Sequence, residues 1–220
     1  MTQPTTQPVS IDHQLAMRTA ATNLQKKFTG VFSQETIERF LTSSYDQFAT
    51  TNTVPNYLPL LAERFAAQRL TALARVEGKA SDGQPIVLFL CVHNAGRSQM
   101  AMGFFQHLAG DRAVAWSGGS EPGSEVNAAA VAAMRERGID ISAEFPKPWT
   151  EEVIRAADVV VTMGCGDACP LYPGKQYLDW ELEDPAGKSV DDVRLIRDDI
   201  ERRVRDLLAS LDVPTAGGDR

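Results

Sequence analysis

The chain has 220 residues, enough for one large domain or two small ones, and its 43% hydrophobic content is that of an ordinary soluble globular protein. The net charge of −7 disfavours general nucleic-acid binding, because such proteins need a basic face to neutralise phosphates. No apolar run approaches the roughly 20 residues of a membrane helix, and residues 1–10 lack the features of a secretory signal. We therefore expect a cytoplasmic protein with no nucleic-acid or membrane partner.

The first third of the chain predicts a small helical domain. Residues 1–10 have the composition of a disordered tail. Three amphipathic stretches follow, at residues 12–28, 34–48 and 57–76. Ser33 is placed as the N-cap of the second stretch, and residues 78–85 have linker composition. We therefore expect a three-helix N-terminal domain over residues 11–77.

After Pro85 the pattern changes to strands that alternate with helices. Residues 86–90 and 158–163 are apolar runs that suit buried strands, and residues 114–117 and 176–180 are two further strand candidates. Helical patterns occupy residues 98–108, 125–137 and 191–211. This alternation predicts an α/β fold, a four-stranded parallel sheet with helices on both faces, over residues 86–213. Residues 214–220 are expected to form a second disordered tail.

The loop after the first strand carries the clearest functional motif. It reads Cys-Val-His-Asn-Ala-Gly-Arg-Ser over residues 91–98, between a buried strand and a helix. Ligands of open parallel sheets bind at this edge, and a helix N-terminus there presents unpaired N–H groups. Five residues between the cysteine and the arginine can wrap their N–H groups around one tetrahedral anion. The predicted oxyanion site consists of Val92, His93, Asn94, Ala95, Gly96, Arg97 and Ser98.

The polar residues of this loop have distinct expected roles. Cys91 is the predicted nucleophile, and the positive field of the loop favours its thiolate. Arg97 can hold two oxygens of the anion in a planar fork, and Ser98 can donate a hydrogen bond to the thiolate. Asn94 suits a left-handed conformation, and Gly96 suits a tight turn of the backbone.

Two alternatives stay open in this loop. His93 is either a general base or, as loop histidines more often are, a spacer or hydrogen-bond donor. Cys91 is alternatively an inert buried thiol, with Arg97 on a solvated helix face. The strand, the glycine-containing loop, the serine and the helix that surround Cys91 make this second interpretation the weaker one.

Cys165 and Cys169 follow the third predicted strand, at the same sheet edge as Cys91. Three cysteines are too few for a disulfide scaffold, and with the scattered histidines they have poor spacing for a zinc site. Two loop cysteines without a shared role are the plainer alternative. Three thiols at one edge favour a thiol relay, with no metal.

A turn before the last helix reads Glu-Asp-Pro-Ala-Gly over residues 183–187. A carboxylic acid here, Asp184, can protonate a leaving oxygen if the turn lies at the mouth of the anion site. Asp-Pro and Ala-Gly also favour a plain surface turn, and the residues alone do not separate the two interpretations.

Residues 86–211 resemble the low-molecular-weight protein tyrosine phosphatase superfamily and, within it, the thioredoxin-coupled arsenate reductases. The resemblance rests on residues 87–101 around Cys91 and Arg97, Trp-Ser-Gly-Gly-Ser-Glu-Pro at 116–122, Arg-Gly-Ile-Asp-Ile-Ser at 137–142, Asp-Val-Val-Val-Thr-Met-Gly-Cys at 158–165 and Glu-Asp-Pro-Ala-Gly-Lys at 183–188. The three cysteines separate the chain from the phosphatases, which need no relay, and from relatives that use a small thiol.

The resemblance implies a reaction on arsenate. Cys91 would attack the arsenic of an arsenate held by the loop and Arg97, while Asp184 protonates the departing oxygen. Cys165 would then attack Cys91 and release arsenite, and Cys169 would attack Cys165 and leave a disulfide for thioredoxin to reduce. One disulfide accounts for both electrons, so no bound cofactor is implied, and phosphate or sulfate would bind as analogues.

The sequence departs from the family at two places. The spacing of Cys165 and Cys169 is shorter than in members with a longer intervening loop. Some relatives bind potassium beneath the anion loop through acidic side chains, and this sequence has Met102 and Lys147 at those positions. We expect no potassium dependence, with the Lys147 ammonium supplying the positive charge.

The helical domain resembles a three-helix extension found on some actinobacterial relatives. A homodimer interface and partner docking are its candidate roles, with simple stabilisation as the alternative. Two other functions remain open for the whole chain. One is a tyrosine phosphatase that uses Cys91, Arg97 and Asp184. The other is a non-enzymatic oxyanion or redox sensor, although the helical domain has no recognisable DNA-binding helix pair.

Overall fold

The computed structural model describes residues 11–49, 57–79, 83–164 and 171–215. The chain divides into two compact units, residues 1–70 and 71–220. The tail predicted at residues 1–10 lies outside the described residues, as do Cys165 and Cys169.

The first unit contains α1 (Ile11–Lys27), α2 (Gln34–Ala49) and the greater part of α3 (Leu58–Val76). Phe48 of α2 and Phe65 of α3 pack edge to face, with ring centroids 5.5 Å apart. Arg69 of α3 donates hydrogen bonds to Ser43 and Ser44 of α2, so that a polar bridge adds to the apolar packing. The hydroxyl of Ser33 accepts a bond from Thr36 N, as expected of an N-cap. The predicted three-helix region is confirmed.

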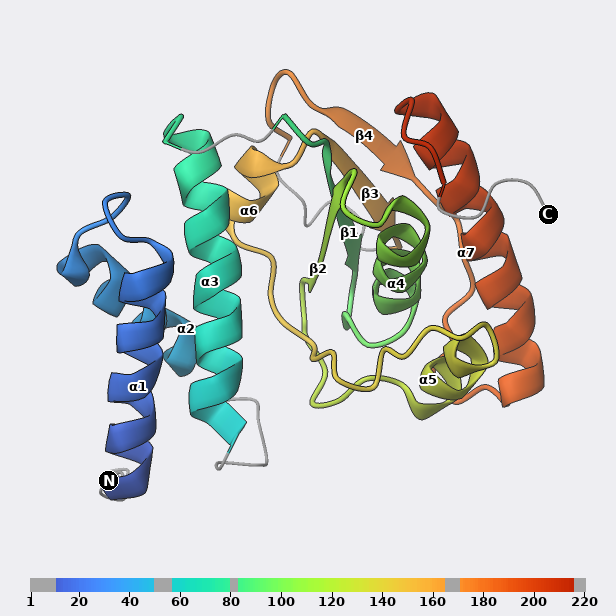
Figure 1. Ribbon diagram of the computed structural model, residues 1–220. Coiled ribbons are helices and arrows are strands. Elements are labelled where there is room, and N and C mark those ends of the chain that lie inside the picture. The colour runs from blue at the N-terminus through green and yellow to red at the C-terminus, as the bar shows by residue number, and fades with distance from the viewer. Residues whose placement is uncertain (1–10, 50–56, 80–82, 165–170, 216–220) are drawn as a thin grey trace. The chain divides into compact units, whose positions relative to one another are not determined.

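The second unit is built on a parallel sheet in the order β2-β1-β3-β4 (Figure 1). Its strands are β1 (Ile86–Cys91), β2 (Val114–Gly119), β3 (Val159–Met163) and β4 (Gln176–Asp179). Its helices are α4 (Arg97–Ala109), α5 (Ala128–Arg135), α6 (Glu151–Ala156) and α7 (Val190–Ser210). The predicted α/β fold is confirmed. Strand order reverses at β1, which therefore ends at the switch point where such sheets bind ligands.

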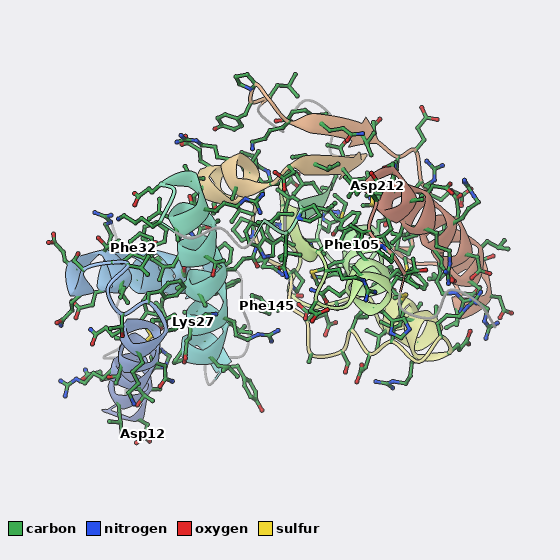
Figure 2. The ribbon with its side chains drawn as sticks, turned by 45° about the horizontal axis from the view of Figure 1, so that its top comes forward. Asp12, Lys27, Phe32, Phe105, Phe145 and Asp212 are labelled. Atoms are coloured by element: carbon green, nitrogen blue, oxygen red, sulfur yellow. The ribbon has the colours of Figure 1, made fainter. Side chains whose placement is uncertain are left out.

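β1 is buried on both faces, and its residues alternate between two cores. Val87, Phe89 and Cys91 belong to the core that α4, α5 and α7 cover. The intervening residues belong to the core that α6 and the end of α3 cover. Phe89 meets Phe105 of α4 edge to face at 5.8 Å, and Figure 2 labels Phe105 on that helix. The side chain of Cys91 is thereby directed toward the α4 face of the sheet.

Two elements differ from their predicted form. The helix expected at residues 125–137 begins only at Ala128, because the side chain of Asn127 accepts a hydrogen bond from Ala130 N and caps the helix. The sequence does not predict α6, because its six residues make too few turns to give a periodic pattern.

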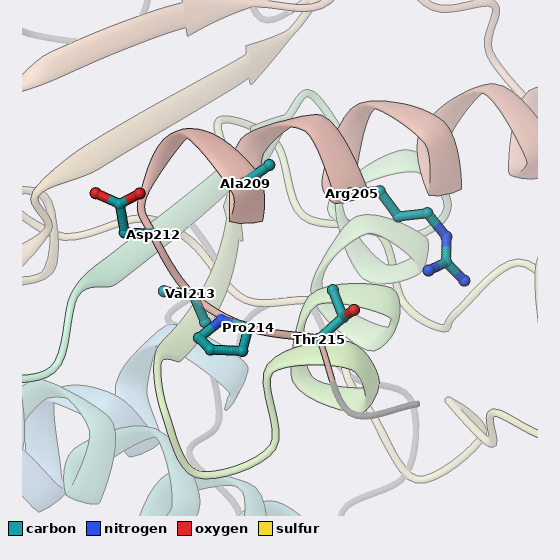
Figure 3. Close-up of a pocket in the computed structure, with 6 residues that line it drawn as sticks. All are labelled: Arg205, Ala209, Asp212, Val213, Pro214 and Thr215. Carbon is teal, nitrogen blue, oxygen red and sulfur yellow. The ribbon is translucent and has the colours of Figure 1, made fainter. Parts of the chain in front are cut away.

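A hollow of about 480 Å³ lies at the C-terminal end of α7 (Figure 3). It is lined by Arg205, Ala209, Asp212, Val213, Pro214 and Thr215, and none of these belongs to the loop after β1. None of the described helices combines the length and apolar character that a bilayer span requires.

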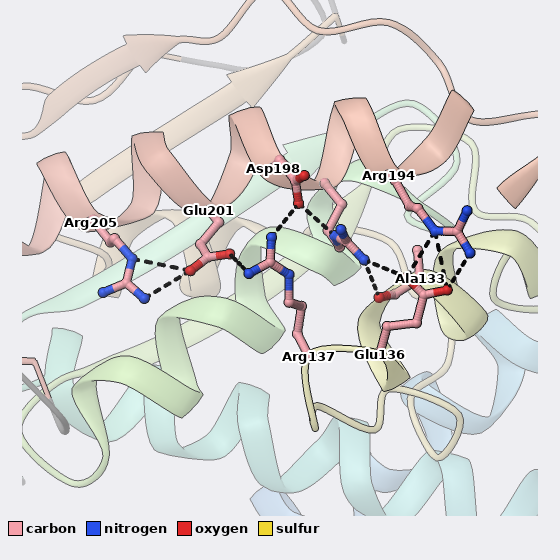
Figure 4. A network of polar contacts seen from close by, with 8 residues as sticks. Ala133, Glu136, Arg137, Arg194, Asp198, Glu201 and Arg205 are labelled. Atoms are coloured by element: carbon pink, nitrogen blue, oxygen red, sulfur yellow. Dashed lines mark hydrogen bonds and ion pairs between the residues drawn. The ribbon is translucent and has the colours of Figure 1, made fainter. Parts of the chain in front are cut away.

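A network of ion pairs joins the end of α5 to α7 (Figure 4). Glu136 binds Arg194 at 2.6 Å and Arg197 at 2.9 Å, and Arg137 binds Asp198 at 2.8 Å. The hydrogen bond from Arg194, followed by that from Arg197, lowers the pKa of Glu136 from 4.5 to about 2. The ionised form of Glu136 is therefore favoured by folding.

We expect Glu136→Gln to destabilise the protein at pH 7. The pKa of Glu136 is lower in the folded than in the unfolded state, so its stabilisation is fully present above pH 4.5 and is lost as the pH falls toward 2. Thermal unfolding of the variant and the wild type between pH 7 and pH 3 tests this, since the gap in Tm should narrow on acidification. Glu151→Gln, at an exposed carboxylate with a longer, 3.6 Å pair with Arg155, is the control, and a gap that stays constant with pH would contradict the expectation.

Candidate functional site

The oxyanion loop, residues 91–98, begins at the C-terminal end of β1. Cys91 is 2% exposed, and its Sγ lies 3.0 Å from Ser98 Oγ in the first turn of α4. Its backbone lies between Gly119 of β2 and Met163 of β3 in the sheet. The predicted contact between Cys91 and Ser98 is confirmed.

The buried side chain of Asn94 organises the inside of this loop. Asn94 has φ of 47°, the left-handed conformation predicted for it. Its Nδ2 donates to Ser98 Oγ at 2.8 Å. Because that oxygen accepts from Asn94, the hydroxyl hydrogen of Ser98 is free to donate to Cys91 Sγ. Donation to sulfur stabilises a thiolate, the form that acts as a nucleophile.

The outer rim of the loop is fixed by hydrogen bonds to its carbonyl oxygens. These bonds run from Glu121 N to Val92 O, from Gly123 N to His93 O and from Asn127 N to Ala95 O, at 2.9, 2.9 and 2.8 Å. In a trans peptide the C=O and the following N–H point in opposite directions. The N–H groups of residues 93, 94 and 96 are therefore turned to the other side, as an anion-binding nest requires.

His93 lies exposed on the rim, with Nδ1 3.0 Å from the carbonyl oxygen of Glu121. A carbonyl only accepts, so the ring nitrogen donates this bond. Of the two expected roles, this contact is that of a hydrogen-bond donor that fixes the rim.

Gly96 is required for a reason that the sequence does not reveal. Its φ of −129° and ψ of −84° are not left-handed, so the tight turn expected there does not depend on a positive φ. A Cβ at this position would lie 2.4 Å from Cγ of Pro185. Gly96 is instead the flat surface on which the Asp-Pro turn packs.

The same turn brings Asp184 to Arg97. Arg97 is 7% exposed and binds Asp184 Oδ2 at 2.7 Å, while it also donates to the carbonyl of Leu182 at 3.3 Å. The other carboxylate oxygen of Asp184 accepts from Ala186 N. The interpretation of residues 183–187 as a plain surface turn is therefore excluded. An oxyanion that binds Arg97 competes with the Asp184 carboxylate for the same guanidinium.

Lys147 and Gln99 support the loop from below. Gln99 Nε2 donates to the carbonyl of Asn94 at 3.0 Å, and Lys147 N donates to Asn94 Oδ1 at 2.9 Å. Lys147 is 2% exposed, and its ammonium lies 3.3 Å from Ser117 Oγ and 4.0 Å from Glu144. The sequence gives no signal for Gln99, because its bond to Asn94 depends on the conformation of the loop and its other partner, the carbonyl of Phe145, is 46 residues away.

Cys165 and Cys169, the other two cysteines expected to take part in a relay, lie outside the described residues. The structure does place the strand that leads to them, because Met163 at the end of β3 pairs with Cys91. Within the described ranges no group of three His, Cys, Asp or Glu side chains gathers to hold a metal ion, and the expectation of a metal-free site stays a prediction.

Comparison with known proteins assigns the family. Residues 86–215 match the family described as low molecular weight phosphotyrosine protein phosphatase. The chain belongs to this family. Residues 17–74 match a second family, described as the protein-tyrosine-phosphatase-like N-terminal domain, so the helical region matches a domain family of its own.

Three relatives indicate the branch of the family. The structure of a thioredoxin-dependent arsenate reductase from Corynebacterium glutamicum is 46% identical, with a TM-score of 0.82 over 91% of this chain and 98% of that one. An arsenate reductase in the phosphate binding state is 36% identical, with a TM-score of 0.51 over 58% of this chain and 98% of that one. The glutaredoxin arsenate reductase of Synechocystis is 38% identical over 57% of this chain and 97% of its own length. The resemblance recognised in the sequence is confirmed.

Lys147→Met is expected to weaken phosphate binding about tenfold, because it removes a positive charge beneath the anion loop. Its Tm should also fall, because methionine loses the contacts of the ammonium with Ser117 Oγ and Glu144. Isothermal calorimetry with phosphate and thermal unfolding test both parts.

Lys175→Met is the control for this prediction. Lys175 lies just before β4, at the opposite end of the sheet from the oxyanion loop, and its ammonium donates to the carbonyl of Ala157. Its effect on phosphate binding should be negligible. Wild-type affinity should be equal in potassium and sodium buffers. An unchanged affinity in Lys147→Met, or a clear preference for potassium, would contradict the role of the Lys147 charge.

Proposed function

We propose that this protein is a thioredoxin-dependent arsenate reductase that works through the thiols of Cys91, Cys165 and Cys169. The observation that carries the proposal is the pairing of Cys91 with Met163, because Cys165 follows two residues later in the chain. The strand end that leads to the second thiol thus lies beside the nucleophile. A phosphatase has no use for this arrangement, and relatives named arsenate reductase support the same choice.

The first step joins Cys91 to arsenic. The N–H groups of the oxyanion loop and the Arg97 guanidinium hold arsenate, which takes the place of the Asp184 carboxylate on Arg97. The Cys91 thiolate forms an S–As bond as one As–O bond breaks. Asp184 acts as the general acid and gives a proton to the departing hydroxyl, which leaves as water.

The second step reduces arsenic. The Cys165 thiolate attacks Cys91 Sγ, a disulfide forms, and the electron pair of the S–As bond stays on arsenic, which leaves as arsenite. Two thiols supply the two electrons, so the step needs no bound metal or organic cofactor. Cys169 then attacks Cys165 and frees Cys91, and the dithiol of thioredoxin reduces the Cys165–Cys169 disulfide.

Each cysteine is needed for turnover in this scheme. In an assay of NADPH oxidation with thioredoxin, thioredoxin reductase and arsenate, the wild type should turn over. Cys91→Ser, Cys165→Ser and Cys169→Ser should each lose at least 99% of the rate, because each breaks one link of the thiol chain.

Thermal unfolding of the three variants controls for loss of the fold. Multiple turnover by Cys169→Ser with thioredoxin alone would rule out the relay of three cysteines. Omission of arsenate gives the background rate, which all four proteins should share.

Asp184→Asn separates binding from chemistry. We expect arsenite formation in a single turnover to slow about a hundredfold or more, because the proton donor is lost. Phosphate should bind several times more tightly, because no carboxylate competes for Arg97. Rapid quench of the first turnover and calorimetry with phosphate measure the two effects.

Glu183→Gln is the matched control for this experiment. Glu183 binds Lys188 at 2.9 Å, and its hydrogen bond raises the pKa of Lys188. It has no contact with Arg97, so both measurements should stay near wild type. A full rate in Asp184→Asn would exclude Asp184 as the acid.

A tyrosine phosphatase is the second candidate, because Cys91 and Arg97 of the oxyanion loop, together with Asp184 of the Asp-Pro turn, suffice for phosphoester hydrolysis. Hydrolysis of p-nitrophenyl phosphate at rates typical of enzymes, undiminished in Cys165→Ser, would favour it over the reductase.

A further inference from the structure

We propose that Asn127 is a positioning residue, which holds the Asp184–Pro185 turn against the oxyanion loop during catalysis. The inference rests on the proposed role of Asp184 as the proton donor. Asn127 lies between the loop and α5 and belongs to neither of the motifs that supply the reacting groups.

Three hydrogen bonds tie Asn127 to three segments. Its backbone N–H donates to the carbonyl of Ala95 in the oxyanion loop at 2.8 Å. Its Oδ1 accepts from Ala130 N at 2.9 Å and caps α5. Its Nδ2 donates to the carbonyl of Pro185 at 3.4 Å. One residue therefore links the anion site, the start of a helix and the turn that carries Asp184.

The chemistry of the amide makes this position specific. Because Oδ1 accepts from α5, the other end of the amide is the donor, and it faces the Pro185 carbonyl. Aspartate retains the cap but places an acceptor against that carbonyl. Serine also retains the cap but is too short to reach the turn. Only an amide of this length meets both demands.

Pro185 is a firm point of attachment for the turn. It is buried, and its ring packs on Gly96, where a Cβ would be 2.4 Å away. Its carbonyl also accepts from Lys188 N at 3.2 Å, so Asn127 reinforces a turn that already forms by itself. Since proline has a fixed φ, the placement of its ring and carbonyl also constrains the preceding residue, Asp184.

The contact matters most when substrate is bound. In the structure the 2.7 Å ion pair with Arg97 holds Asp184 in place. Arsenate that binds Arg97 removes this attachment at the moment when Asp184 must face the departing oxygen. The packing on Gly96 and the bond from Asn127 then remain to hold the turn. Asn127 is thus expected to affect the rate of proton donation more than the stability of the fold.

The test is a double-mutant cycle on the first turnover with arsenate. Asn127→Ser should slow arsenite release about three- to tenfold, the effect of one neutral hydrogen bond, and Asn127→Asp should slow it further. In the Asp184→Asn background, Asn127→Ser should cause no additional slowing, because its effect acts through Asp184. In Asn127→Ser, two control properties should stay at wild-type values. They are the Tm and the rate at which iodoacetamide alkylates Cys91, measured by mass spectrometry.

Three results would overturn the proposal. The first is a wild-type rate in both Asn127 variants. The second is that Asn127→Ser slows the reaction as much in the Asp184→Asn background as in the wild type. The third is that Asn127→Ser also loses alkylation of Cys91, which would mean damage to the oxyanion loop. A full rate in Asp184→Asn alone would instead remove the proposed acid, so that failure of the proposed function is distinguishable from failure of this inference.

Discussion

The site depends on one buried amide, the side chain of Asn94. Its nitrogen donates to the Ser98 hydroxyl, which is thereby free to donate to Cys91, and its oxygen accepts from Lys147 N and from Gln99. A left-handed residue is needed to turn the backbone at this point, and asparagine tolerates that conformation better than most. Loss of the amide would leave several buried polar groups unpaired at once, each at a cost of about 1–3 kcal/mol.

The contacts around this amide are of two kinds: some hold the site rigidly, and one can be replaced by a contact with substrate. β1, buried on both faces, fixes Cys91 at the switch point of the sheet, and hydrogen bonds from the segment after β2 fix the carbonyl rim. We treat the pairing of Arg97 with Asp184 as exchangeable, because an oxyanion in the loop would compete with the carboxylate for the same guanidinium. Arg97 can thus pass from Asp184 to arsenate, which leaves the carboxyl group of Asp184 beside the bound oxyanion.

The sequence predicts the parts of this site that are local in the chain. The buried run of β1 and the loop-to-helix transition bring Cys91, Asn94 and Ser98 into contact, because these three lie within eight residues of one another. Asp184 could be a candidate only, since a turn that contains Asp-Pro has many uses, and its contact with Arg97 spans 87 residues.

The contacts that the sequence does not reveal are those made by packing. The need for glycine at position 96 arises from Pro185, and the tether from Asn127 reaches the same distant turn. Gln99 reads as an ordinary helical residue until the fold brings Phe145 and Asn94 to it. α6 is too short to leave a periodic signal. For Gly96, Asn127 and Gln99 the contact that decides the role of the residue is set by tertiary structure, which a local sequence pattern does not encode.

The most direct test of the account is to trap the first disulfide. Reduced Cys169→Ser protein should be mixed with one equivalent of arsenate, without thioredoxin, then acid-quenched, digested and analysed by mass spectrometry. The account predicts a disulfide between Cys91 and Cys165 together with one equivalent of arsenite. Arsenite release without this disulfide, or reduced Cys91 and Cys165 after incubation with arsenate, would contradict it.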